Sequence, residues 1–269
     1  MMNFLSNSVF PSLLTYGLVL FLSSWLAPDS HSPHVLLRAT ILQWLLLPGS
    51  IIFAGWIFRY DLIKTLKLSK PSLSNVAWSF LAALCLLPLL DEFTYLVCSF
   101  VGIPSSFQDQ VLRFLRAETV FQLLLLWMAL ALTPAICEEL FFRGFLLSRL
   151  TASLSFGISL ALSSILFGIF HRSEIYFLPT TLAGFLLAIV AWKAQSVFPA
   201  MLIHCVVNSW GVLVANSSIR TLLPWTANPE PVPLWLLLTA LAGLSFSIWG
   251  VEKRGNCPRP LAKEGTARE

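Results

Sequence analysis

The chain has 269 residues, of which 57% are hydrophobic and only 11% are charged, with a formal net charge of +4. A soluble globular domain carries roughly a quarter charged residues, and one soluble core cannot hide this much apolar surface. The composition therefore excludes a soluble protein and indicates an integral, multi-pass membrane protein, whose positive charge reports orientation rather than nucleic-acid binding.

Eight apolar stretches are long enough, or nearly so, to cross a hydrocarbon core of about 30 Å as helices, the only open-chain structure that satisfies its backbone in lipid. The first stretch follows a segment without Lys or Arg, unlike a cleavable signal peptide, so we expect it to be retained. We predict an all-α, polytopic bundle of about eight transmembrane helices at residues 9–27, 36–58, 73–99, 120–149, 154–171, 175–192, 197–216 and 232–250.

The segments between and after these stretches predict the topology. With the N-terminus inside, the expected cytoplasmic segments hold eleven Lys and Arg residues and the outer segments hold five, which favours an N-in and C-in arrangement. The polar tail 252–269 is expected to be disordered, leaving one integral-membrane domain at 1–251 with a catalytic core at about 120–216.

Segment 102–119 is polar but carries apolar side chains at helical spacing. This pattern predicts a helix lying on the membrane face. The apolar side chains concerned are Phe107, Val111, Leu112 and Leu115.

The five cysteines are scattered and form no CxxC pair, so they indicate small buried side chains rather than disulfides or a zinc site. His31 and His34 lie in a short loop and are expected to be solvated. Ionisable groups within spans are costly, which makes each one a functional hypothesis. Those groups are Asp91, Glu92, Glu138, Glu139, Arg143, His171 and His204, joined by the polar Asn208.

The stretch "PAICEELFFRGF" places two acids and one base in the fourth predicted span. Glu139 and Arg143 are four residues apart, so they share a helix face and can pair. Glu138 lies about 100° around the helix and keeps its carboxylate free. A carboxylate facing a low-dielectric cavity resists ionisation, which suits it to act as a general base near neutral pH.

Two further pairs lie four residues apart on later spans, Phe167 with His171 and His204 with Asn208. A lone histidine in a membrane helix is more often a helix–helix hydrogen-bond partner, and an isolated Glu–Arg pair can be a structural staple. The three pairs together favour chemistry, because hydrolysis needs a base for water and donors for the tetrahedral intermediate.

These motifs resemble those of the CAAX-protease and bacteriocin-processing (CPBP) intramembrane endopeptidases, also called the abortive-infection family, over residues 130–212. The resemblance implies hydrolysis of a peptide bond in a membrane-anchored or lipidated substrate. It rests on three motifs in the family's order: Glu138-Glu139-x-x-x-Arg143, Phe167-x-x-x-His171 and His204-x-x-x-Asn208.

The family's roles carry over to these positions as expectations. Glu138 and His171 would activate water, and His204 and Asn208 would stabilise the oxyanion or help to hold a metal. The supporting residues would be Glu139, Arg143 and Phe167.

These residues fit both a metal-dependent site and a metal-free site. His171 and His204 would bind the metal, and zinc is the candidate, with Glu138 as the third protein ligand. No HExxH motif occurs, and a ligating Glu138 would leave the reaction without a base, so a metal-free Glu–His pair uses the residues with less conflict.

Two other functions fit the same residues. Buried acids and histidines suit the proton relay of a transporter or channel, although no internal repeat is evident. A catalytically silent scaffold of the same fold is the second alternative. Asp91 and Glu92 would either line the catalytic cavity or reach the outer face.

Straight, upright helices would place His171 too far from the depth of Glu138. A fifth span beginning near Phe156, helix tilt, or a bend at Pro134 would bring the two together.

Overall fold

The computed structural model describes residues 9–26, 35–104, 106–226 and 230–252. His31, His34, Cys257 and the predicted tail beyond Glu252 lie outside the described residues. Within them all regular secondary structure is helical, which confirms the predicted all-α fold.

Five helical segments are long and apolar enough to cross a bilayer: α3 (Val35–Phe58), α5 (Leu73–Val101), the continuous helix Val120–Thr151, α11 (Glu174–Ala194) and α12 (Phe198–Ala215). Three shorter apolar helices account for the other predicted stretches: α2 (Val9–Trp25), α10 (Phe156–Phe170) and α14 (Leu234–Gly250). The chain is thus an integral, multi-pass membrane protein, while the number of crossings and the N-in, C-in orientation stay predictions.

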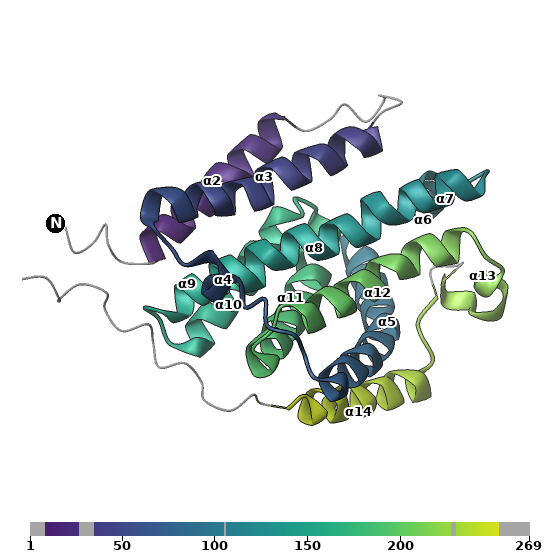
Figure 1. Ribbon diagram of the computed structural model, residues 1–269. Helices are drawn as coiled ribbons and strands as arrows, with labels where there is room; N and C mark the ends of the chain where they lie inside the picture. The colour runs from purple at the N-terminus through teal and green to yellow at the C-terminus, as the bar shows by residue number, and fades with distance from the viewer. Residues whose placement is uncertain (1–8, 27–34, 105, 227–229, 253–269) are drawn as a thin grey trace, which may run out of the picture.

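Short helices lie at the two ends of this bundle. Figure 1 shows α4 (Leu62–Leu66) at one end and α6 (Ser106–Phe114) with α13 (Ile219–Leu222) at the other. A 3-10 turn, η3 (Pro224–Thr226), follows α13. The helix predicted within 102–119 is therefore present as α6.

Polar residues mark where several helices begin. The side chains of Ser72, Ser155 and Ser173 each accept a hydrogen bond from a backbone N–H in the first turn of α5, α10 and α11. Thr119 forms a capping box with Gln122. Such caps satisfy N–H groups that a helix leaves without internal partners.

The fourth predicted span is one continuous helix that contains two π-helical segments. It runs through α7 (Val120–Trp127), the π-helical η1 (Met128–Leu132), α8 (Thr133–Glu139), the π-helical η2 (Leu140–Leu146) and α9 (Leu147–Thr151). Pro134, in the first turn of α8, has no N–H to donate to the preceding turn. The helix therefore passes Pro134 with altered winding on both sides of the two glutamates, and π-turns of this kind are frequent at functional sites.

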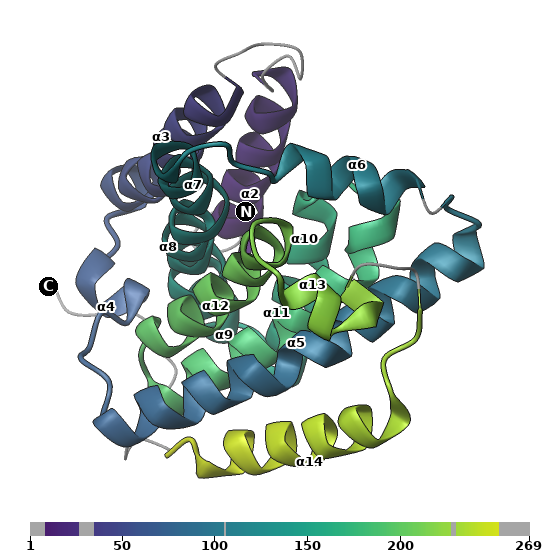
Figure 2. The ribbon, with the colours of Figure 1, turned by 90° about the vertical axis from the view of Figure 1, so that its right-hand side faces the viewer.

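Two apolar clusters hold the bundle around this helix. One gathers Phe141, Phe142 and Phe145, all fully buried, against α2, α3 and α10. The other joins α5, α11 and α12. Figure 2 shows α14 lying along the outer side of α5, with which it packs.

The contact between α10 and α11 is close at Gly168. A Cβ at this position would lie 2.8 Å from the carbonyl oxygen of Phe177 and would also overlap the Thr181 hydroxyl. Only glycine lets the two backbones approach this far, as in other membrane helix pairs that pack through small residues.

We expect Gly168→Ala to lower the unfolding free energy by about 1–3 kcal/mol, because the added methyl group overpacks a backbone contact. Gly157→Ala is the matched control in the same helix, since nothing lies within 4 Å of its Cβ position. Thermal unfolding in detergent measures both. Equal melting temperatures for the two variants would contradict the close packing.

Candidate active site

Arg143 is fully buried and makes the ion pair that the sequence predicts. Its Nη1 lies 2.7 Å from Glu139 Oε1, and its Nη2 donates to the Gly184 carbonyl at 3.3 Å. The guanidinium also sits over the Phe167 ring, with Cζ 4.1 Å from the ring centroid. These contacts supply a buried cation with the partners that it needs away from water.

Glu139 has a second role that the spacing does not reveal. The same oxygen, Oε1, lies 2.8 Å from Nδ1 of His204, which comes from α12. One carboxylate therefore links the first predicted motif to the third. Because a carboxylate accepts hydrogen bonds, Nδ1 of His204 carries the proton and Nε2 faces the other way.

Glu138 is also buried, but its two oxygens differ. Gln43 of α3 donates its Nε2 to Oε1 at 2.7 Å. Oε2 has no hydrogen-bond partner and lies 3.9 Å from Nε2 of His204, too far for a direct bond. The predicted asymmetry between the two glutamates is present, since Arg143 bonds to Glu139 only.

Gln43, which bonds to Glu138, belongs to none of the three motifs. It lies 95 positions before Glu138, in an apolar helix with no recognisable motif. Its signal is weak but visible: a carboxamide within the run "ILQWLLL" has to find a hydrogen-bond partner inside the bundle.

His171 caps the C-terminus of α10, and its orientation follows from one contact. Its Nδ1 lies 2.8 Å from the Phe167 carbonyl oxygen, which can only accept. The proton of the neutral ring is therefore on Nδ1, and the lone pair is on Nε2. The ring centroid of Phe167 lies 4.8 Å from that of His171 and 5.9 Å from that of His204.

Asn208 is tied to the winding of the fourth helix. It donates Nδ2 to the carbonyl of Leu130 at 3.1 Å. This carbonyl precedes Pro134 by four residues, so the proline cannot donate to it. The carboxamide of Asn208 supplies a hydrogen bond there and keeps its second N–H for another partner.

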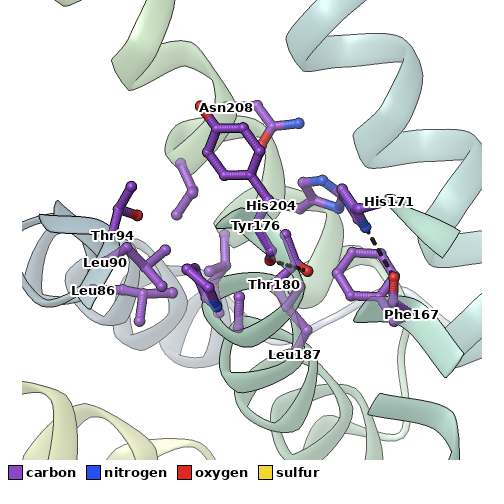
Figure 3. Close-up of a pocket in the computed structure, with 14 residues that line it drawn as sticks. Leu86, Leu90, Thr94, Phe167, His171, Tyr176, Thr180, Leu187, His204 and Asn208 are labelled. Atoms are coloured by element: carbon purple, nitrogen blue, oxygen red, sulfur yellow. Dashed lines mark hydrogen bonds between the residues drawn. The ribbon is translucent and has the colours of Figure 1, made fainter. Parts of the chain in front are cut away.

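Four of the residues in the second and third motifs, Phe167, His171, His204 and Asn208, line a cavity of about 210 Å³. Figure 3 shows His171, His204 and Phe167 on one side of it and Leu86, Leu90 and Thr94 of α5 on the other. The expectation that Glu138 faces the cavity is wrong: it does not line the cavity, and its Oε2 lies 3.9 Å from Nε2 of His204, which does. α10 begins at Phe156, and His171 lines the same cavity as His204 and Asn208.

Asp91 and Glu92 do not line this cavity. Glu92 accepts the backbone N–H of Val232 at 2.7 Å, and Asp91 accepts Nε1 of Trp210 at 3.1 Å. Glu92 therefore ties α5 to the segment before α14. Asp91 lines a neighbouring cavity instead.

The residues were tested as a metal site. In the part of the chain that the structure describes, no three His, Cys, Asp or Glu side chains come together as a metal-binding group. Nδ1 of His171 and of His204, the predicted zinc ligands, already has a partner, so each ring could bind a metal only through Nε2. A catalytic zinc needs three protein ligands, so the arrangement does not fit one, and the reaction proposed below passes through no metal.

The fold and site define a multi-pass membrane protein with a buried glutamate–histidine centre. Residues 120–210 match the family model described as Rce1-like, type II CAAX prenyl endopeptidase Rce1-like. This match contains all three motifs and confirms the resemblance to the CAAX-protease (CPBP) family. No curated protein and no solved structure matches the chain.

Arg143→Met should cost about 3–5 kcal/mol of stability, because it leaves Glu139 as a buried carboxylate without its cation. The double variant Glu139→Gln with Arg143→Met should recover at least half of this loss, since a neutral residue at position 139 no longer needs the cation. Denaturant unfolding in mixed micelles measures the cycle. An Arg143→Met variant as stable as the unaltered protein would contradict the pair.

Proposed function

We propose that this protein is an intramembrane endopeptidase that hydrolyses a peptide bond in a membrane-anchored or lipidated protein. One observation carries the proposal. His171, His204 and Asn208, from two helices, line one cavity, and the partnerless oxygen of Glu138 lies beside His204. The family match over residues 120–210 supports the reaction class.

Water activation falls to Glu138, with His171 as its partner. Gln43 holds one oxygen of Glu138, which leaves Oε2 to take a proton from water. His171 offers the lone pair on Nε2, because the Phe167 carbonyl fixes the proton on Nδ1. The two acceptors orient the water for attack on the carbonyl carbon of the substrate.

Stabilisation of the oxyanion falls to His204 and Asn208. Nδ1–H of His204 donates to Glu139, so in the imidazolium form the ring presents Nε2–H on its other side. This Nε2–H and the second N–H of Asn208 then donate to the oxygen of the tetrahedral intermediate. Donors fixed in a water-poor site stabilise such charge more than they would in water.

Glu138 both accepts and returns the proton that the reaction transfers. The carboxylate takes one proton as water adds to the carbonyl, and the carboxylic acid then returns it to the leaving nitrogen. The C–N bond breaks, and the products are a new carboxylate and an amine. Glu139 and Arg143 position His204 and take no part in proton transfer.

Glu138→Gln should lower kcat by about 100-fold to 10,000-fold, because the amide cannot accept the proton. The rate is measured with purified protein in nanodiscs and a membrane-anchored peptide whose fluorescence is quenched until it is cleaved. An unchanged melting temperature controls for folding. Full activity of Glu138→Gln would reject the assignment, and solute flux without cleavage would favour the transporter alternative.

The same assay tests whether cleavage depends on a metal when a chelator is added. Activity that survives a strong chelator, in protein without stoichiometric metal by elemental analysis, agrees with the glutamate-type reaction. Activity lost to the chelator and restored by added zinc would contradict it.

Gln43→Leu should lower kcat by about tenfold with little change in KM, since it removes a hydrogen bond of about 1.5 kcal/mol that orients Glu138. Thr40→Val is the matched control, because the Thr40 hydroxyl bonds only locally, to the Leu36 carbonyl. An equal kcat for both variants would remove Gln43 from the site.

A further inference from the structure

A second, larger cavity adjoins the catalytic one. Its volume is about 340 Å³, and its walls come from α5, α6, α12 and the segment around η3. Both cavities are lined by the same four residues, Leu90, Thr94, Tyr176 and Val207. Figure 3 labels three of these on the wall of the cavity that His171 and His204 line, so the two cavities adjoin along these side chains.

The apolar face of α6 closes this cavity. Phe107, Val111, Leu112 and Leu115 all line it and are half-buried. The sequence predicts that these side chains rest on the membrane face. In the folded protein they line this cavity, and they give it an apolar wall that suits aliphatic or aromatic groups of a ligand.

The charge of the cavity has one sign. Asp91 and Glu230 are its charged lining residues, and its lining contains no Lys, Arg or His. Glu230 is exposed, whereas Asp91 is half-buried in the middle of α5. A ligand with a buried negative charge would meet repulsion here, and a cationic ligand would meet its complement.

Asp91 has capacity for such a partner. Trp210 donates to Oδ2 at 3.1 Å and the indole of Trp225 also faces the carboxylate, but a carboxylate can accept about four hydrogen bonds. A carboxylate at this depth is costly unless a cation or several donors offset its lost hydration. A Lys or Arg side chain within the cavity would supply both a positive charge and N–H donors.

We propose that the second cavity binds the substrate segment next to the cleaved bond and selects an apolar segment carrying one Lys or Arg, whose cation pairs with Asp91. The proposal rests on the proposed function, because it places a peptide in the catalytic cavity. The shared wall favours a peptide continuing from that cavity over a separate ligand. An acidic residue at the same place is rejected.

The first test measures binding without cleavage. The probes are membrane-spanning peptides rich in Leu and Ala, each with Lys, norleucine or Glu at one position, and the position is moved along the peptide. Their affinity for the full-length Glu138→Gln variant in nanodiscs is measured by fluorescence energy transfer. At one or two positions we expect Lys to bind about tenfold more tightly than norleucine, and Glu more weakly than either. Equal affinities at every position would overturn the proposal, whether or not the protein cleaves peptides.

Substitutions assign the effect to Asp91. Asp91→Asn keeps an acceptor for Trp210 but loses the charge, so the preference for Lys over norleucine should fall to about onefold. Glu92→Gln is the matched control and should keep the preference, because Glu92 bonds to Val232 and does not line the cavity. A preference retained in Asp91→Asn, or lost equally in both variants, would overturn the assignment.

The same peptides then serve as substrates of the unaltered protein. The ratio of kcat/KM for Lys over norleucine should match the ratio of affinities, since binding of this side chain is uniform between ground state and transition state. Cleavage of all peptides with no such ratio would overturn the cavity proposal alone. Binding with the ratio but no cleavage would overturn the proposed function alone.

Discussion

The site depends on one carboxylate oxygen. Oε1 of Glu139 holds both Nη1 of Arg143 and Nδ1 of His204, so it joins two helices and places one imidazole. The arginine pairs with Glu139, so one cation accompanies the two adjacent carboxylates in this buried cluster. A bilayer core penalises uncompensated charge, so these contacts lower the cost of burying Glu139, Arg143 and His204 together.

Much of the fold could be predicted because a membrane leaves few choices. Backbone groups in lipid have to pair within their own helix, so each apolar stretch becomes a helix at nearly the predicted residues. Local spacing also predicts the Glu139–Arg143 pair, because four residues always share a helix face. The second and third motifs also predict Phe167, His171, His204 and Asn208, which line the cavity.

The rest depends on contacts between helices far apart in the sequence. Nothing in the sequence around Gln43 identifies Glu138 as its partner, because that contact requires α3 to lie beside α8. Helical spacing finds the apolar face of α6 but cannot distinguish a lipid surface from a cavity wall. The expected alternatives for Asp91 and Glu92 were incomplete for the same reason: one acid lines a second cavity and the other holds a backbone N–H.

The proline before the two glutamates has an effect on a distant helix. Because Pro134 withholds an N–H, the Leu130 carbonyl is open to Asn208, and one amide hydrogen of that side chain is committed there. Another residue at position 134 could donate to this carbonyl itself and release the carboxamide to rotate. Positions 134 and 208 are thus coupled through a single backbone oxygen, and substitutions at the two should show non-additive effects on turnover.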